Sequence, residues 1–215
     1  MARNNPGPRQ YRSVLREEQA STTRKRVLDA AGRCFAANGF TATTLAAIAA
    51  EAGVSVETVQ SHGPKKQLLL AALETATAGV EGGRSILEVP AAQAVLAEQR
   101  ARDGLLGLAA FAAELNGRIG RLWQALAAAA QGDADIAAAY AGLQERIRAD
   151  LLKVARLLQQ RGGLRTDMSE ESVGATLFVL TSPYQHELLV VQAGWSEEGY
   201  LAWLEQMLIE TVLAP

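Results

Sequence analysis

Apolar residues recur along most of this chain at steps of three and four positions, the spacing that places side chains on one face of an α-helix. The repeat is clearest over residues 133–161, and further stripes run from about Thr22 to Asn38 and from Ser196 to Val212. No stretch alternates polar and apolar residues with the period of two that a half-buried strand requires. The pattern therefore predicts an all-α chain of about nine or ten helices.

Glycine and proline pairs divide these helical stretches. Gly63-Pro64 precedes a new helix, Gly162-Gly163 ends the long repeat, and Ser182-Pro183 bends or splits a later helix. Glycine costs about 1 kcal/mol against alanine in a helix interior, so a glycine within a helical stretch marks either close helix contact or a break. Four such positions fall between residues 91 and 131: Gly104, Gly107, Gly117 and Gly120.

The strongest local signal is the run T-L-A-A-I-A-A-E-A-G-V-S-V-E-T-V, which starts at Thr44. Two helices that cross at a tight turn need a methyl-sized residue at the crossing, and Ala49 supplies one. The turn four residues later needs a positive φ, which glycine adopts without a Cβ clash, and Gly53 stands there. Val59 is then expected to pack back on the first helix. The run predicts a helix-turn-helix whose second helix, from about Ser55 to His62, reads DNA.

Charge is distributed unevenly along the 215 residues, although the net charge is only −2. Residues 1–66 carry ten Lys and Arg against five Asp and Glu, whereas residues 67–215 carry eleven against eighteen. A basic head on an acidic body fits the binding of a polyanion at one end. The first 20 or so residues contain Pro6, Gly7 and Pro8 and few apolar side chains, so an extended, flexible basic arm is predicted there.

The residue types present exclude several classes of function. One cysteine rules out an internal disulfide, and with two histidines it offers no zinc spacing, so neither a metal nor a cofactor is expected. Cys34 lies on an apolar stripe and is interpreted as a small buried hydrophobe. The absence of a nucleophile elbow, an H-E-x-x-H motif and a phosphate-binding glycine loop argues against an enzyme. No signal peptide or apolar span is found, so a cytoplasmic protein outside the membrane is expected.

Residues 22–69 thus contain three predicted short helices, the run F-T-A-T-T-L-A-A-I-A-A-E-A-G-V-S and the segment G-P-K-K-Q-L-L at the start of a fourth helix. Over residues 22–70 the chain resembles the TetR family of ligand-responsive transcriptional regulators. The later segments LTSPYQHELL and GWSEEGYLAWLEQML are similar to the last two helices of many members. After the arm predicted at 1–20, the resemblance implies a helix-turn-helix DNA-binding domain at 21–66 and a helical effector-binding and dimerisation domain at 67–215.

The chain departs from the family pattern at the end of the recognition helix. Most members have tyrosine at the position of Gln60 and phenylalanine at the position of Gly63. Lys66 falls at the family's lysine if no gap is opened, and Lys65 takes that role if the phenylalanine is simply deleted. The departure leaves an alternative open, namely a helical interaction or ligand-sensing protein whose degenerate helix-turn-helix no longer binds DNA.

The residues expected at DNA lie in the helix-turn-helix and at the start of the following helix. The first turn and a half of a recognition helix points at base edges, so Val56, Glu57 and Gln60 are the base-reading candidates. The side chains assigned to phosphates carry hydroxyl or cationic groups: Thr43, Thr44, Thr58, His62 and Lys66. Ser55 and Ser61 complete the polar face, with Lys65 as the alternative to Lys66.

Some of these residues have a simpler interpretation. Thr44 and Ser55 are placed to cap helices whether or not they touch phosphate, and His62 alternatively stands at an exposed turn without a function. The arginines of the arm either enter a minor groove or form a solvated tail: Arg3, Arg9, Arg12 and Arg16.

The resemblance places a ligand cavity among the middle helices of the body, where aromatic and amide side chains are the candidates. His186 follows the Pro183 break and is expected at either the cavity or the dimer surface. The predicted ligand-binding residues are Phe111, Asn116, Trp123, Tyr140, Phe178, Tyr184 and His186.

The resemblance implies a homodimer formed through the last two helices. Taken together, the observations predict a regulator that binds a double-stranded, palindromic DNA operator in this form. It is expected to act as a repressor that a small, largely hydrophobic and neutral or weakly charged effector releases from the operator.

Overall fold

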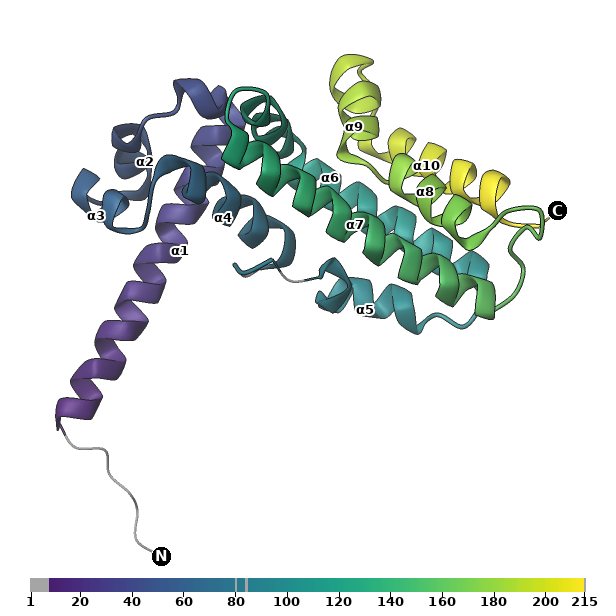
Figure 1. Cartoon of the computed structure of the whole chain (residues 1–215), viewed down its shortest axis with the longest axis horizontal. Helices are drawn as coiled ribbons and strands as arrows, with labels where there is room; N and C mark the ends of the chain where they lie inside the picture. Colours follow the sequence, from purple (N-terminus) through teal and green to yellow (C-terminus); the bar gives the residue numbers. More distant parts are fainter. Residues whose placement is uncertain (1–7, 80, 84, 215) are drawn as a thin grey trace, which may run out of the picture.

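The computed structural model describes residues 8–79, 81–83 and 85–214, with side chains described from residue 19 onward. Its named elements are all helices, as the sequence predicted. Helices α1 to α4 gather at one end, and the long helices α6 and α7 run side by side into a body completed by α5, α8, α9 and α10 (Figure 1). In chain order the elements are α1 Pro8–Ala42, α2 Leu45–Ala52, α3 Val56–Ser61, α4 Lys65–Ala78, the 3₁₀ turn η1 Ile86–Glu88, α5 Pro90–Ala97, α6 Ala101–Ala130, α7 Ala134–Gln160, α8 Glu170–Leu180, α9 Pro183–His186, the π-helical turn η2 Glu187–Gln192 and α10 Glu197–Val212.

Local hydrogen bonds set the boundaries of the helix-turn-helix where the sequence predicted them. The Thr44 hydroxyl accepts a hydrogen bond from the N–H of Ala47 and begins α2, and the Ser55 hydroxyl accepts one from the N–H of Thr58 and begins α3. Gly53 ends α2 in the left-handed region, with φ 63°. A side chain at this position would strain the backbone, which is why glycine is required here.

Close packing at the crossing of α2 and α3 is also confirmed. Ala49 is buried, and its carbonyl accepts a hydrogen bond of 3.0 Å from the N–H of Val54 just after the turn. Val59 and Ile48 are fully buried and belong to the same hydrophobic cluster. The predicted frame of small residue, glycine turn and returning valine therefore holds the two helices together.

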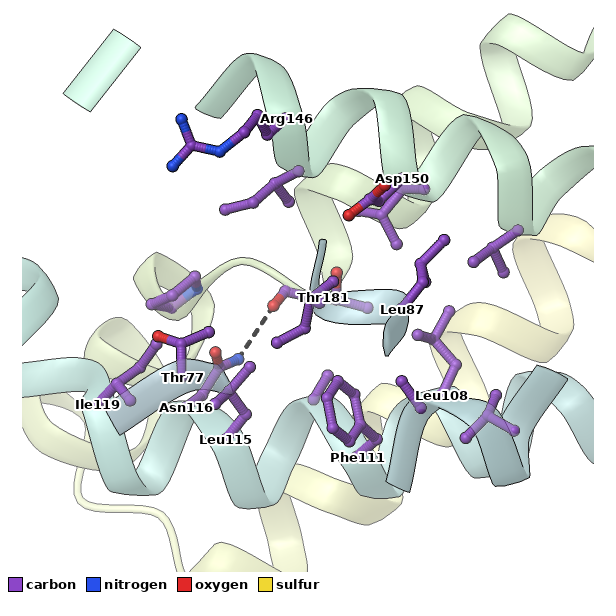
Figure 2. A pocket seen from close by; sticks show the side chains of 18 of the residues that line it. Thr77, Leu87, Leu108, Phe111, Leu115, Asn116, Ile119, Arg146, Asp150 and Thr181 are labelled. Carbon is purple, nitrogen blue, oxygen red and sulfur yellow. Dashed lines mark hydrogen bonds between the residues drawn. The ribbon is translucent and has the colours of Figure 1, made fainter. Parts of the chain in front are cut away.

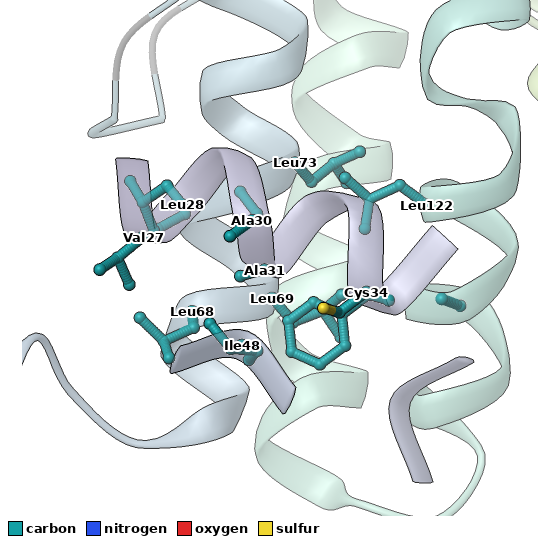
Figure 3. Packing of buried hydrophobic residues seen from close by; sticks show 14 of the residues in the cluster. Val27, Leu28, Ala30, Ala31, Cys34, Ile48, Leu68, Leu69, Leu73 and Leu122 are labelled. Atoms are coloured by element: carbon teal, nitrogen blue, oxygen red, sulfur yellow. The ribbon is translucent and has the colours of Figure 1, made fainter. Parts of the chain in front are cut away.

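The helix-turn-helix does not have a core of its own. Figure 3 shows Val27 and Leu28 of α1, Ile48 of α2 and Leu68 of α4 meeting in one cluster, with Leu122 of α6 at its edge. The same cluster continues into the body through Ile119, Trp123 and Leu126 of α6 and Ile136 of α7. Helix α6 therefore packs directly against the cluster that supports α2 and α3.

A second cluster holds the rest of the body together, where α6, α7, α8 and α10 bury Leu105, Leu158, Leu177 and Leu204. Helix α6 runs unbroken through its four glycines. A Cβ at Gly104 would lie 2.8 Å from Cδ2 of Leu158 in α7. Of the two roles predicted for these glycines, close helix contact is the one observed.

The predicted extended arm over residues 1–20 is wrong from residue 8 onward, because α1 begins at Pro8. Proline suits the first turn of a helix, and residues 9–31 contain neither glycine nor proline to stop it. The first turns of α1 project away from the other helices (Figure 1). Because they pack against none of the other described helices, they carry no apolar stripe from which the helix could be predicted. Arg3 and the side chains of Arg9, Arg12 and Arg16 lie outside the described residues.

Candidate functional site

The exposed face of α3 carries the side chains that were assigned to base edges. Glu57 and Gln60 are exposed, whereas Val56 is half-buried against the N-terminal cluster. The free backbone N–H at the start of α3 and the Ser55 hydroxyl lower the pKa of Glu57, which is therefore ionised at neutral pH. In a major groove, carboxylates are acceptors for cytosine N4 and glutamine amides are partners for adenine.

The hydroxyl groups around α3 all make local hydrogen bonds while remaining at the surface. The Ser55 and Thr58 hydroxyls lie 3.1 Å apart, and the Ser61 hydroxyl donates to the carbonyl of Thr58 at 2.7 Å. Thr44 caps α2 and is exposed. The predicted capping roles are thus observed, and they leave oxygen atoms of these residues facing solvent.

Thr43 does not fit its predicted contact with phosphate. Its side chain is buried, and its hydroxyl lies within hydrogen-bonding distance of the carbonyls of Gly39 (2.7 Å) and Cys34 (3.1 Å). The hydroxyl completes the end of α1 at the Gly39 kink and is turned away from solvent. Cys34 itself is buried, as predicted, and burial raises the pKa of its thiol.

His62 supplies no cation at neutral pH. Burial and the neighbouring Arg24 guanidinium lower its pKa below the usual value of about 6.5. Arg24 also donates a hydrogen bond of 2.8 Å to the carbonyl of His62 and pairs with Glu81. A phosphate contact by His62 is therefore limited to a neutral hydrogen bond.

The two neighbouring lysines of α4 have different surroundings. Lys65 turns inward: its Nζ donates to the carbonyls of Phe40 (2.8 Å) and Thr43 (2.9 Å) and lies 4.3 Å from the centre of the Phe40 ring. Lys66 instead forms an ion pair with Asp135 in the first turn of α7. Lys65 is thus a structural clamp, and Lys66 remains the candidate for phosphate.

The backbone conformation at Gly63 suits the glycine that replaces the family's phenylalanine. Gly63 has φ 120°, a conformation that side-chain-bearing residues rarely adopt. A Cβ there would lie 2.8 Å from Oε1 of Gln67. The turn between α3 and α4 therefore follows a path that excludes a phenylalanine at this position.

A cavity of about 120 Å³ lies in the body between α6 and α7, closed on one side by η1 and α5. Figure 2 shows Phe111, Leu108 and Asn116 of α6 below it and Asp150 of α7 above it. Three of the predicted ligand-binding residues line it: Phe111, Asn116 and Trp123. The Asn116 amide donates to the carbonyl of Thr181 at 3.0 Å, drawn as a dashed line in Figure 2, and to the Tyr200 hydroxyl at 3.1 Å.

A smaller hollow of about 90 Å³ adjoins this cavity and shares Trp123 with it. Phe178 and Tyr184, two more predicted residues, line this hollow. Tyr140 stands beside it, with its hydroxyl 2.9 Å from that of Tyr184 and its ring edge-on to Trp123. Burial, reinforced by the Tyr184 hydroxyl, raises the pKa of Tyr140, so this phenol stays protonated.

His186, predicted at either the cavity or the dimer surface, lines neither of these two hollows. The ring is buried, with Nε2 3.0 Å from both carboxylate oxygens of Glu197, and it packs edge-on against Tyr200. Gly117 and Gly120 of α6 make room for it. The residue joins α9 to α6 and α10.

Sequence reasoning missed a charged residue in the wall of the cavity. Asp150 is buried, with 4% of its surface exposed, and accepts hydrogen bonds from the Ser85 hydroxyl (2.7 Å) and from Nζ of Lys153 (2.9 Å). The available signal was its register, because position 150 falls three residues after Ile147 and four before Val154 on the apolar stripe. A charged residue on a buried stripe is rare without a partner.

The helix-turn-helix also matches a known family. The model of the family described as "Bacterial regulatory proteins, tetR family" matches residues 27–73, which cover the core-forming part of α1, all of α2 and α3 and most of α4. Residues 27–73 therefore form a DNA-binding domain of the TetR family. This match supports the predicted function, a DNA-binding transcriptional regulator.

Solved structures share the fold of this chain over most of its length. A transcriptional regulator from Saccharomonospora viridis, in complex with choline, is 21% identical, with a TM-score of 0.72 over 91% of this chain and 100% of the other. The SmeT–triclosan complex is 19% identical, with a TM-score of 0.67 over 90% and 92%. NalD of Pseudomonas aeruginosa, the secondary repressor of the MexAB-OprM multidrug efflux pump, is 16% identical, with a TM-score of 0.60 over 91% and 98%.

No curated protein sequence matches this regulator. Within its described residues, no helix combines the length and the apolar character needed to cross a membrane.

Proposed function

We propose that this regulator is a dimeric repressor that leaves its operator when a small molecule occupies the cavity between α6 and α7. One observation carries the proposal: Ile119 and Trp123 of α6 belong both to the cavity wall and to the cluster that supports the helix-turn-helix. A ligand that moves these side chains also acts on α1 and α4, because interiors are close-packed and transmit displacement. Cavity and DNA surface are thus mechanically joined.

The free energy required is modest. An effector that binds the released state better than the DNA-competent state by about 1–3 kcal/mol weakens operator affinity roughly 5- to 150-fold. Helix α4 is the lever in this proposal, because its first turn carries Lys66, the phosphate candidate, while its C-terminal turn brings Thr77 into the cavity wall.

Dimerisation is proposed through the outer surface of α8 and α10, extended by the segment that joins them. Large apolar side chains are exposed along this stretch: Val179 by 53%, Leu188 by 50% and Val191 by 48%, together with Tyr184 and Trp195. An apolar surface of this kind is costly to leave in water and is typical of a protein contact. Two copies joined here would present two α3 helices to one operator in the cytoplasm.

The printed descriptions of structural neighbours support a small-molecule effector and repression. The Saccharomonospora viridis regulator holds choline and SmeT holds triclosan, and SmeT and NalD are both described as repressors of multidrug efflux pumps. A largely apolar cavity in the present chain fits a hydrophobic effector of about one aromatic ring in size.

Two substitutions test the proposed roles at DNA. Gln60→Ala is expected to weaken binding at one operator position by about 1–3 kcal/mol and to relax specificity there. Lys66→Met is expected to weaken all sequences alike and to reduce the slope of log affinity against log salt by about 1. Fluorescence anisotropy on an operator and its single-base variants, at several salt concentrations, measures both effects.

Asp135→Asn is the control, because it breaks the ion pair of Lys66 without removing a cation from α4. Its salt slope should stay that of the unmodified chain. If Gln60→Ala and Lys66→Met lose the same operator affinity on every DNA sequence, the assignment of Gln60 to a base contact is wrong.

A further inference from the structure

Asp150 places a carboxylate in a cavity whose wall is otherwise almost entirely apolar. It is 4% exposed, and its neighbours in the wall include Leu108, Ile147 and Val154. In Figure 2 its side chain extends from α7 toward the space above Phe111 and Leu108. A carboxylate removed from water in this way interacts strongly with any opposite charge that enters the same space.

The protein neutralises this carboxylate only weakly. One partner, the Ser85 hydroxyl, carries no charge, and the other, Lys153, exposes 61% of its side chain to solvent. An exposed lysine is a poor counter-ion, since its ammonium group is held largely by water. Each oxygen of Asp150 accepts one described hydrogen bond, and a carboxylate has about four acceptor positions.

Arg146, the second charged residue in the wall, is not the counter-ion of Asp150. Arg146 exposes 45% of its side chain and lies 3.9 Å from Glu74 of α4, where a second hollow joins the cavity. Figure 2 shows its guanidinium extending away from Asp150. Arg146 is therefore paired with Glu74 at the opening of the cavity, and it does not neutralise the carboxylate of Asp150.

Two aromatic residues complete the binding features of the wall. Trp123 and Phe111 both line the cavity, and ring faces attract cations from which water has been removed. Trp123 is itself buried, and its indole N–H interacts with the Tyr140 hydroxyl beside the cavity.

We propose that the effector is an organic cation, an amine or quaternary ammonium group carried on an apolar or aromatic body, and that its charged group lies at Asp150. The proposal deepens the proposed function, on which it rests for taking this cavity as the effector site.

Benzyltrimethylammonium and 2,2-dimethylpropylbenzene test this directly, because they have the same shape and differ by a nitrogen cation in place of a carbon. Calorimetric titration of the full chain without DNA is expected to give at least about tenfold tighter binding of the cation. In Asp150→Asn, which keeps an acceptor for Ser85, the preference should disappear while the neutral compound binds as before.

Lys153→Met is a second variant. It is expected to fold normally, because the Lys153 side chain is exposed and the substitution removes only a cation that competes for Asp150. It should strengthen binding of benzyltrimethylammonium and leave the neutral compound unaffected. Equal binding of the two compounds by the unmodified chain, or an unchanged preference in Asp150→Asn, would overturn the proposal. Tighter binding of the anion 3-phenylpropionate would do the same and would implicate Arg146.

Fluorescence anisotropy of the labelled operator in the presence of each compound distinguishes charge selectivity in the cavity from release of the operator. If the cation binds selectively but operator affinity is unchanged, the charge selectivity stands and the release mechanism fails. If the neutral compound binds equally well and releases the operator, the mechanism stands and the inference about charge fails.

Discussion

A Leu188→Glu protein is expected to be monomeric and to bind its operator about 10²- to 10⁴-fold more weakly than the unmodified chain. Leu188 lies in η2, half exposed, within the apolar surface proposed for dimerisation. In a two-fold interface the substitution occurs twice, and each buried glutamate would have to give up water without a partner. Loss of the partner removes the high effective concentration of the second α3 helix at the second half-site.

Light scattering measures the mass of this variant, and fluorescence anisotropy its operator affinity. Ala94→Glu is the matched control, because Ala94 is exposed on α5, away from the proposed interface. The control should remain dimeric with unchanged affinity. A dimeric Leu188→Glu protein with full operator affinity would place the interface elsewhere.

Lys65→Met is expected to lower the free energy of unfolding by about 1.5–3 kcal/mol. The carbonyls of Phe40 and Thr43 would lose a charged donor at 2.8 and 2.9 Å, and the Phe40 ring would lose the cation above it. Methionine retains the apolar stem, so the loss measures the ammonium contacts. Urea unfolding followed by circular dichroism gives the change.

Lys66→Met is the matched control one residue away. Its ion pair with Asp135 is exposed at the surface, where water screens the charges, so the pair contributes little to stability. The two variants should therefore separate stability from DNA affinity: Lys65→Met affects unfolding, and Lys66→Met affects the salt dependence of operator binding. A stability loss that is larger in Lys66→Met would contradict the clamp assigned to Lys65.

The helix-turn-helix could be predicted to within about a residue because its determinants are local. Thr44 and Ser55 cap helices from positions that the sequence displays, and Gly53 ends α2 through its own φ angle. Long repeats such as α7 were equally clear, since period and capping residue coincide at Asp133. These signals need no knowledge of what the helices pack against.

Sequence reasoning was weakest where a partner distant in sequence decides the role of a side chain. Thr43 and His186 are polar and looked available, yet each is buried by contacts that only the tertiary fold creates. Lys65 and Lys66 are adjacent and chemically identical, and only the position of Phe40 and Asp135 in space separates them. Asp150 was overlooked because it interrupts an apolar stripe without breaking the helix.

The most direct test of the central claim is a footprint of the full chain on DNA selected from a random duplex pool at low salt. Sequence-specific binding by two α3 helices predicts an inverted repeat with two protected half-sites, their centres about one helical turn, 34–36 Å, or a multiple of it apart. Failure to select any sequence, or protection without two-fold symmetry, would contradict the account and favour a helical protein whose helix-turn-helix no longer reads DNA.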